Sequence, residues 1–560
     1  MRIALAQLNY VIGDFEKNVF KIKQAIARAK KENVDLVVFS ELAVCGYPPL
    51  DFLEVSNFIK QCENAIDEIA AESRTCGIAA IVGAPSVNPK LEGKNLFNSS
   101  YFLADGKIKS IAHKALLPNY DVFDEYRYFE PNRSFHCIEL NGVKMAMTIC
   151  EDLWNVEDDP MYVFCPMDKL IQEKPQLIIN IAASPFDYAH AEQRKAILKR
   201  NAREYKLPLV YVNHVGAQTE LIFDGGSLAM NAEGEIINEC KYFEEDFQII
   251  EAPLPPKGGI TASRTPPIEA PFLPPLGGGG AKIHRIHNAL ILGIKDYFSK
   301  QNFTKAILGL SGGIDSAVVL CLAAEALGKD NVLPVLMPSS FSSKGSVDDS
   351  VSMCENLGIN YKTISIENVF NGFLDSLKPH FENLSFNTTE ENIQARSRGV
   401  LLMALSNKFG YILLNTSNKS EMAVGYGTLY GDMCGGLSVI GDVYKTEVYE
   451  LAHYINSERE IIPTNIINKP PSAELHHDQK DSDSLPDYHL LDKLLYEYIE
   501  HRKGPAKLAA MGFDEVLIKR VLRLVNTSEY KRFQAPPILR VSPKAFGMGR
   551  RLPIVGKYLS

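Results

Sequence analysis

The sequence predicts two α/β domains joined by a segment without regular structure, and three observations carry this prediction. Short apolar runs with strand character alternate with amphipathic helical stretches on both sides of the middle of the 560-residue chain. Residues 253–280 contain eight prolines and six glycines, a composition that helix and strand interiors do not tolerate. A glycine turn at 309–316 joins an apolar run to a helical one, as in a doubly wound parallel sheet.

The first predicted domain, residues 1–252, contains strands at a steady spacing and two clear helical stripes, at 19–29 and 192–204. Apolar strands that alternate with helices indicate a layered, mixed α/β fold. The expected strands are 2–8, 35–39, 78–82, 99–103, 143–149, 177–181, 209–213 and 226–230.

Residues 253–280 form the predicted linker, although the segment Pro-Phe-Leu-Pro at 271–274 also has the composition of an SH3 ligand. The second predicted domain, residues 281–560, begins after it. Its strands alternate with helical stretches, which indicates a doubly wound parallel sheet. The expected strands are 306–310, 332–337, 362–366 and 411–414. Ligands of such sheets bind at the carboxyl ends of the strands, where the 309–316 turn lies.

The composition limits the classes of partner. With 46% hydrophobic and 23% charged residues the chain is an ordinary globular protein, and a net charge of −9 argues against a nucleic-acid partner. The N-terminus has a strand pattern rather than a signal peptide, and no apolar run approaches the ~18 residues of a membrane helix. Ten cysteines without a C-x-x-C pair predict reduced thiols in a cytoplasmic protein.

The turn Ser311-Gly312-Gly313-Ile314-Asp315-Ser316 has the layout of an anion cradle. Glycines let backbone N–H groups converge, and the following helix N-terminus favours negative charge. The turn lacks the lysine that ends a Walker A loop, and its aspartate can hold Mg²⁺. It therefore suits a pyrophosphate that departs from AMP better than it suits γ-phosphoryl transfer.

Three reactive residues stand at strand ends or just beyond them: Glu41, Lys114 and Cys150. A helix after Cys150 would stabilise the thiolate, and a lysine beside it would lower the thiol pKa and stabilise an oxyanion. A carboxylate would serve as general base and then as general acid. Singly, each has an ordinary explanation as a buried small side chain, a solvated charge or a helix cap.

Together, the segments 41–49, 113–120 and 150–154 resemble the nitrilase superfamily of carbon–nitrogen hydrolases, in its glutaminase branch. The resemblance covers about residues 1–250 and implies an αββα sandwich. It implies that Cys150 attacks the glutamine amide, that Glu41 moves the proton, and that Lys114 and the backbone N–H of Glu151 hold the oxyanion. Further residues that it assigns to the glutamine site are Tyr120, Glu125, Ser184, Asp187 and His190. His190 stands where related enzymes usually carry Lys or Arg.

The 311–316 turn resembles the N-type ATP pyrophosphatases, which have the adenine nucleotide alpha hydrolase-like fold, and the likeness to NAD synthetases extends over about 285–555. The segments that carry it are 392–398, 415–421 (interpreted as a strand), 430–432, 442–446, 481–488 and 531–537. The resemblance implies ATP as co-substrate, Mg²⁺, and amidation of nicotinic acid adenine dinucleotide with release of AMP and pyrophosphate. Ammonia would come from glutamine through a sequestered channel.

The same resemblance assigns the binding residues of the second domain. Asp315 and Glu421 would hold Mg²⁺, Arg396 and Lys445 are candidate phosphate partners, and the 478–487 loop would close over the adenylate. Pairing of copies through this domain is also implied. The residues assigned to ATP are Gly309, Leu310, Ser311, Gly312, Gly313, Ile314, Asp315, Ser316 and Thr416, and those assigned to the dinucleotide are Asn392, Glu421 and Lys531.

Two other functions remain open from the sequence. One keeps both chemistries but passes the ammonia to another carboxylate or to a carbonyl. The other makes one domain a ligand-binding regulator without catalysis, which is weakened because Glu41, Lys114, Cys150 and the whole 309–316 turn are present.

Overall fold

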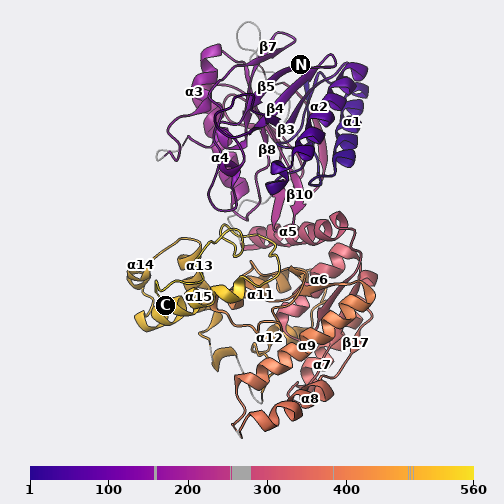
Figure 1. The fold of residues 1–560 in the computed structure, drawn as a ribbon, viewed down its shortest axis with the longest axis vertical. Coiled ribbons are helices and arrows are strands. Elements are labelled where there is room, and N and C mark those ends of the chain that lie inside the picture. Colours follow the sequence, from indigo (N-terminus) through magenta and orange to yellow (C-terminus); the bar gives the residue numbers. More distant parts are fainter. Residues whose placement is uncertain are drawn as a thin grey trace. The chain divides into compact units, whose positions relative to one another are not determined.

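The computed structural model describes residues 1–156, 160–252, 254, 279–382, 384–476, 479, 481–483 and 485–559. The chain forms two compact units, Met1–Pro274 and Pro275–Ser560 (Figure 1). Most of the predicted linker, and with it the predicted domain boundary, lies outside the described residues. Helix α5 begins at Gly279, inside the stretch that the composition assigns to the linker.

The N-terminal unit consists of two sheets with helices. Its strands are β1 (Arg2–Gln7), β2 (Leu36–Val38), β3 (Ala79–Val87), β4 (Leu96–Ala104), β5 (Lys107–His113), β6 (Ile138–Leu140), β7 (Val143–Ile149), β8 (Leu177–Ala182), β9 (Leu209–Asn213), β10 (Val215–Gln218), β11 (Leu221–Asp224), β12 (Leu228–Met230), β13 (Ile236–Glu239) and β14 (Asp246–Glu251). Its α-helices are α1 (Phe15–Lys31), α2 (Ser56–Cys76), α3 (Pro166–Leu170) and α4 (His190–Tyr205).

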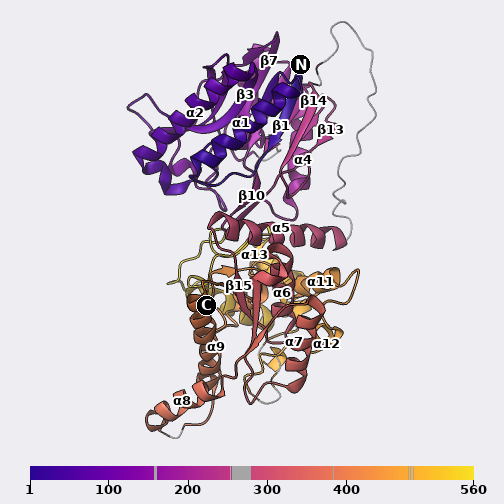
Figure 2. The same ribbon diagram turned by 90° about the vertical axis from the view of Figure 1, so that its right-hand side faces the viewer.

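The two six-stranded sheets of this unit pack face to face. One has the strand order β14-β1-β2-β3-β4-β5 and the other β13-β12-β9-β8-β7-β6. In β1, Ile3 and Leu5 belong to the core between the sheets, whereas Ala4 and Ala6 pack under α1 and α2 on the outer face (Figure 2). Helices α3 and α4 add Met167, Leu170 and Leu198 to the core around the second sheet. These layers form the expected αββα sandwich.

The C-terminal unit is built around one sheet. Its strands are β15 (Ala306–Gly309), β16 (Val332–Leu336), β17 (Lys362–Thr363), β18 (Ile412–Asn415) and β19 (Leu437–Ser438). Its α-helices are α5 (Gly279–Lys300), α6 (Ile314–Leu327), α7 (Lys344–Leu357), α8 (Glu367–Leu377), α9 (Thr388–Phe409), α10 (Lys419–Val424), α11 (Lys445–Ile455), α12 (Thr464–Asn468), α13 (Tyr488–Ile499), α14 (Pro505–Ala510), α15 (Glu515–Thr527) and α16 (Glu529–Arg532).

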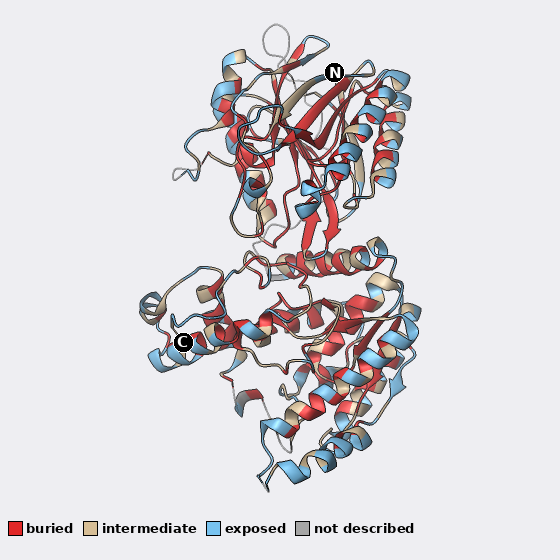
Figure 3. Cartoon of the chain, viewed as in Figure 1, coloured by how far each residue is buried: buried red, intermediate tan, exposed pale blue. Residues whose placement is uncertain are grey.

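All four strand pairs of this sheet are parallel, in the order β17-β16-β15-β18-β19. The order reverses direction along the chain at β15, so this strand is the topological switch point at which ligands of such sheets bind. Buried residues run along the strands and the inward faces of the helices, and the outer helix faces are exposed (Figure 3). The doubly wound sheet predicted from the sequence is confirmed.

Some predicted elements differ from the observed ones. Strands β7 and β9 have the predicted bounds, but helix α2 was not predicted, although Phe58, Ile59, Cys62 and Ile66 form its buried stripe. The strand interpretation of 415–421 is wrong: β18 ends at Asn415 and α10 starts at Lys419. The reason is a capping box, in which Asn418 Oδ1 accepts from the Glu421 N–H and Glu421 Oε2 accepts from the Asn418 N–H. Within the described residues, no helix has the length and apolar character needed to cross a membrane.

Candidate active sites

Glu41 and Lys114 form a buried ion pair in the N-terminal unit. Lys114 Nζ donates to Glu41 Oε1 at 2.7 Å, and both side chains are almost completely buried. Asn98 Nδ2 donates to the same oxygen at 2.7 Å, and the backbone N–H of Ala183 donates to Glu41 Oε2 at 2.9 Å. Three donors therefore surround Glu41, and both of its oxygens act as acceptors. Asn98 had no predicted role.

Glu125 is the second carboxylate on Lys114, as the resemblance implies. Lys114 Nζ donates to Glu125 Oε1 at 2.8 Å, and the hydroxyl of Tyr47 donates to the same oxygen at 2.8 Å. Burial raises the pKa of Glu125, although Lys114 opposes this. Burial alone would lower the pKa of Lys114, but Glu125 and Glu41 together raise it above its ordinary value. Lys114 is therefore a permanently charged ammonium between two carboxyl groups.

Cys150 follows β7 at a sharp turn into a single 3₁₀ turn, Cys150–Leu153. Its φ of +41° is unusual for a residue with a side chain and holds the thiol at the strand end. Burial, followed by the charge of Glu41, raises the pKa of Cys150 well above its ordinary value, although Lys114 opposes this. The predicted lowering of this pKa is wrong, because desolvation outweighs the nearby lysine and no α-helix follows directly. The resting group is a thiol and needs a base.

Asp152, which has no predicted role, connects the nucleophile turn to the segment that carries Lys114. Its Oδ1 accepts from the backbone N–H groups of Ala115 and Leu116, both at 2.9 Å, and its Oδ2 accepts from the Ile149 N–H at 3.0 Å. One buried carboxyl thus fixes the segments that carry Lys114 and Cys150. Its position just after an apolar strand was the available signal.

We expect the stabilising effect of Asp152 to depend on pH. Burial raises its pKa from 3.8 to about 6, and the three N–H donors offset only part of this. The folded protein therefore binds the carboxyl proton of Asp152 more tightly than the unfolded chain does. The contribution of this protonated group to the free energy of unfolding is complete below about pH 4 and is lost as pH rises through 6. The loss is at most about 1.4 kcal/mol per pH unit.

The measurement is the difference in melting temperature between the unaltered chain and Asp152→Asn. From pH 4 to 6 the unaltered chain should lose stability relative to the variant, and above pH 7 the difference should be constant. A difference that does not change between pH 4 and 6 would contradict the assignment.

Tyr120 lies beside the nucleophile turn. Its hydroxyl donates to Glu151 Oε1 at 2.9 Å, and the hydroxyl of Tyr162 donates to the same oxygen at 3.0 Å. Burial and Glu151 raise the pKa of Tyr120, and the charge of Cys150 contributes. Tyr120 is thus close to Cys150, as the predicted glutamine contact requires.

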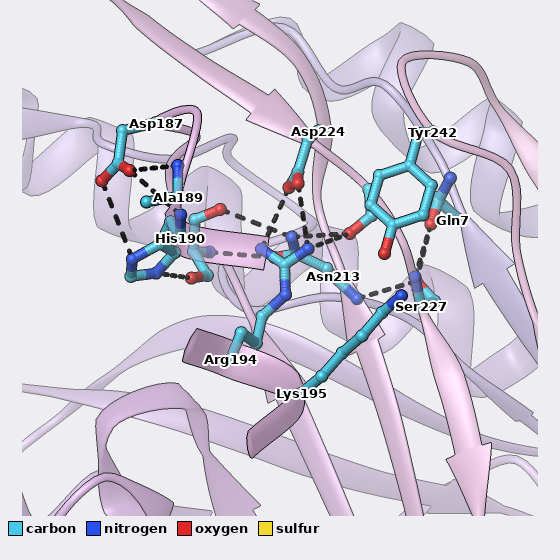
Figure 4. Close-up of polar contacts among 12 residues, drawn as sticks. Gln7, Asp187, Ala189, His190, Arg194, Lys195, Asn213, Asp224, Ser227 and Tyr242 are labelled. Carbon is cyan, nitrogen blue, oxygen red and sulfur yellow. Dashed lines mark hydrogen bonds and ion pairs between the residues drawn. The ribbon is translucent and has the colours of Figure 1, made fainter. Parts of the chain in front are cut away.

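Ser184, Asp187 and His190 form one polar group. Asp187 and His190 lie next to each other in Figure 4. Ser184 Oγ and His190 Nε2 lie 2.9 Å apart, and His190 Nδ1 lies 3.9 Å from Asp187 Oδ2. The imidazole stacks on Trp154 with ring centroids 5.0 Å apart and an interplanar angle of 12°. Because Trp154 directly follows the Cys150–Leu153 turn, His190 is held close to the nucleophile.

A buried network supports Ser184 from the opposite side. Asn213 Oδ1 accepts from the Ser184 N–H at 2.9 Å, and Asn213 Nδ2 donates to the carbonyl of Gly225 at 2.9 Å. Arg194 forms a bidentate pair with Asp224, with both N–O distances 3.0 Å (Figure 4). These rigid contacts fix the backbone that presents Ser184.

In the C-terminal unit, the 309–316 turn lies between β15 and α6, as predicted. Gly312 has φ +79°, and a Cβ there would lie 2.4 Å from the carbonyl oxygen of Ser346. Only glycine fits this position. The Ser316 hydroxyl donates to the Gly313 carbonyl at 3.0 Å, and Ser311 Oγ accepts from the Gly313 N–H at 3.2 Å. The turn is therefore a preformed cradle at a helix N-terminus.

A cavity of about 310 Å³ opens above this turn. Of the residues predicted for ATP, Mg²⁺ or the dinucleotide, those that line it are Gly309, Leu310, Ser311, Gly313, Ile314, Asp315, Ser316, Thr416 and Glu421. Lys445, Arg398 and Asp481 also line it. Arg396, a predicted phosphate partner, is exposed and donates to the carbonyl of Leu429.

Two carboxylates share the cavity wall with one ammonium. Asp315 Oδ1 accepts from Asn418 Nδ2 at 2.9 Å, and Lys445 Nζ donates to Asp315 Oδ2. Glu421 Oε1 lies 3.8 Å from the same ammonium, and burial together with Asp315 raises the pKa of Glu421 well above its ordinary value. The cluster brings two carboxyl groups to one ammonium and offers only oxygen ligands, and a bound cation would favour ionisation of Glu421, so these residues fit Mg²⁺.

Asn392 and Lys531 do not line this cavity. The hydroxyl of Thr428 donates to Asn392 Oδ1 at 2.7 Å, and Lys531 Nζ donates to the carbonyls of Gly425 and Gly427 at 2.7 and 2.8 Å. Both side chains thus converge on the 425–428 turn, next to Tyr426, which lines the cavity. The structure brings these two residues to one turn but not to the 309–316 cradle.

Comparisons with known proteins match both units of the chain. The family model of carbon–nitrogen hydrolases matches residues 2–257, and that of NAD synthases matches residues 286–535. A glutamine-dependent NAD(+) synthetase of Synechocystis is 43% identical over 99% of this chain and 98% of its own length. The chain belongs to the glutamine-dependent NAD(+) synthetase family.

Further members of the family agree along the whole chain. The enzyme of Thermotoga maritima is 40% identical over 100% of this chain and 99% of its own. A solved synthetase of Acinetobacter baumannii, in complex with adenosine diphosphate, is 36% identical, covers 99% of this chain and 98% of its own, and has a TM-score of 0.75. The structure of the family member from Cytophaga hutchinsonii, 21% identical over 99% of this chain and 98% of its own with a TM-score of 0.80, supports the fold.

Proposed function

We propose that the chain makes NAD⁺ from nicotinic acid adenine dinucleotide, using ATP and ammonia that it releases from glutamine. One observation supports the proposal: a single chain holds a buried Cys150 near Glu41 and Lys114 in one unit, and a glycine turn with two carboxyl groups at a cavity in the other. The first site suits amide hydrolysis, and the second suits adenylation of a carboxylate.

In the first site Cys150 is the nucleophile and Glu41 the base. Glu41 takes the thiol proton, the sulfur attacks the glutamine amide carbon, and the proton then goes to the leaving ammonia. An ammonium group has three donors, and Lys114 uses two of them on Glu41 and Glu125. The third donor and the backbone N–H of Glu151 stabilise the oxyanion. Water then hydrolyses the thioester to glutamate and frees the thiol.

In the second site the 311–316 turn binds the ATP phosphates through backbone N–H groups and the serine hydroxyls, and Thr416 contacts the nucleotide. Asp315 and Glu421 would hold Mg²⁺, which would supply positive charge beside the phosphates. The nicotinate carboxylate attacks the α-phosphorus, and ammonia then displaces AMP from the adenylate. Asn392 and Lys531 would contact the dinucleotide from the 425–428 turn. The missing Walker lysine agrees with cleavage of the α–β bond.

We also propose that ammonia passes to the second site without release into solvent, that the protein acts in the cytoplasm, and that several copies of the chain assemble. All ten cysteines are free thiols, which suits a reducing compartment. The C-terminal unit has an apolar groove of about 620 Å³ lined by Val400, Met403 and Tyr430, of which Tyr430 is 67% exposed. Such a patch is typical of an interface between copies, and light scattering measures their number.

The alternative acceptors are separated by product analysis. With glutamine, ATP and nicotinic acid adenine dinucleotide, the chain should release AMP, pyrophosphate and NAD⁺ in equal amounts. If ATP is consumed only with another carboxylate or carbonyl compound, the assigned acceptor is wrong. If ATP is never consumed, the C-terminal unit is a regulator.

His190 should bind the α-carboxylate of glutamine together with Ser184. We expect His190→Ala to raise the KM for glutamine about tenfold, because a hydrogen bond to a charged group is lost, and to leave kcat within about twofold. Steady-state glutaminase kinetics measure both quantities. Gln193→Ala, an exposed position on the same helix, should change neither. A drop in kcat with an unchanged KM would place His190 outside the glutamine site.

A further inference from the structure

The first turn of α10 sends neighbouring side chains in different directions. Asn418, its N-cap, holds Asp315, and Glu421 lines the nucleotide cavity. Between them, Lys419 has no exposed surface and does not line the cavity. Lys419 is therefore not placed to touch a substrate, and its charge must act inside the protein.

The Lys419 ammonium joins two buried carboxylates. It lies 2.9 Å from Asp442 Oδ1 and donates to Glu500 directly after helix α13, and both carboxylate side chains are almost fully buried. The ring of Tyr444 lies 4.8 Å from the ammonium. Burying two carboxylates is unfavourable unless a cation compensates them, and Lys419 supplies that charge.

The same ammonium fastens the C-terminal segment 537–544. It donates to Ser542 Oγ at 2.6 Å and to the carbonyl of Lys544 at 3.0 Å. Asp442 accepts from the N–H groups of Val541 and Ser542 at 2.8 and 2.7 Å. A segment more than a hundred residues further along the chain is thus anchored at the base of α10.

The neighbouring Ser420 links this turn to a second cavity residue. Its hydroxyl donates to Asp492 and accepts from the backbone N–H of Lys445 at 2.9 Å. Lys445 is the cation on Asp315. The turn 418–421 therefore carries direct contacts to Asp315 and Lys445 and supplies Glu421 itself.

We propose that Lys419 is a positioning residue of the synthetase site. Its ammonium clamps the C-terminal segment, Glu500 and Asp442 together and so holds the first turn of α10. This turn keeps Asp315 and Glu421 in the geometry that binds Mg²⁺ with ATP. This inference rests on the proposed function. Without the ammonium, its bonds to Ser542, to the Lys544 carbonyl and to Glu500 are lost, so the clamp opens and the turn is free to rotate. The repulsion between Asp442 and Glu500 that remains lowers the stability of the unit in addition.

The test compares ATP binding to the full chain with and without Mg²⁺, by titration calorimetry, in the unaltered chain and in Lys419→Met. With Mg²⁺, we expect the variant to bind ATP about tenfold more weakly than the unaltered chain, as is typical when support of a metal ligand is lost. In EDTA, the ATP affinities of the two proteins should agree within about twofold. The Mg²⁺ concentration for half-maximal ammonium-driven synthesis should rise by a similar factor. General loosening of the unit would weaken binding in both conditions.

Two further variants separate positioning from folding. Lys300→Met removes an ion pair with Asp296 in α5 of the same unit and should leave the Mg²⁺ effect unchanged. The double variant Lys419→Met with Glu500→Gln removes one of the two repelling charges. It should recover thermal stability, while the loss of ATP affinity with Mg²⁺ remains. If the single variant does not fold, the binding comparison uses the double variant.

Unchanged Mg²⁺-dependent binding in folded Lys419→Met, or its full recovery in the double variant, would overturn the inference. Failure of the unaltered chain to form NAD⁺ would instead overturn the proposed function, and the binding comparison would still report on Lys419.

Discussion

Cys150→Ala should lower glutamine-driven NAD⁺ formation by at least about a thousandfold and leave ammonium-driven formation within about twofold. Alanine removes the sulfur that forms the thioester, and no other group at the site replaces it. The C-terminal unit, which carries the nucleotide cavity, is unaltered, so added ammonia still reaches an intact adenylating site. The measurement is the initial rate of NAD⁺ formation with each nitrogen source.

Cys165→Ala is the matched control for this change. Cys165 lies in the same unit, but its thiol contacts the hydroxyl of Tyr205 rather than the Glu41 and Lys114 pair. The control should retain both activities. If Cys150→Ala loses ammonium-driven synthesis to the same degree as glutamine-driven synthesis, the two-site account is wrong.

Asp315→Asn should produce the converse result. We expect a loss of at least about a hundredfold in NAD⁺ formation from either nitrogen source, while glutamine is still hydrolysed to glutamate. Asparagine keeps the size of the side chain but removes the charge that pairs with Lys445 and would bind Mg²⁺. Parallel assays of NAD⁺ and of glutamate measure the two outcomes.

Asp348→Asn, an exposed carboxylate on the neighbouring helix α7, controls for the loss of one negative charge. It should keep both reactions. Retention of ammonium-driven synthesis by Asp315→Asn would remove Asp315 from the synthetase site.

The sequence predicted the architecture well wherever a pattern is local. The apolar run of β7 and the glycine turn at 309–316 depend on neighbouring residues only, and both lie where predicted. The strand interpretation of 415–421 is wrong because the polar residues of this segment show no hydrophobic periodicity that would distinguish a strand from a helix. The helix start is instead set by a capping box, the reciprocal hydrogen bonds of Asn418 and Glu421.

The electrostatics of the site could not be predicted in the same way. The nearby Lys114 suggested a lowered thiol pKa for Cys150, but burial depends on the whole fold and raises it. Asp152 and Lys419 were missed for a related reason: most of their partners lie far away in the sequence. Those of Asp152 are at 115–116, and those of Lys419 are at 442, 500, 542 and 544.

The central claim is that nitrogen freed at Cys150 enters NAD⁺ at the second site of the same chain. The most direct measurement supplies glutamine labelled with nitrogen-15 at its side-chain amide, together with an excess of unlabelled ammonium, and determines the label in the NAD⁺ carboxamide by mass spectrometry. The account predicts that the label in NAD⁺ greatly exceeds its share of the ammonia in solution. Label equal to that share would show that ammonia equilibrates with solvent, and absence of label would contradict transfer from glutamine altogether.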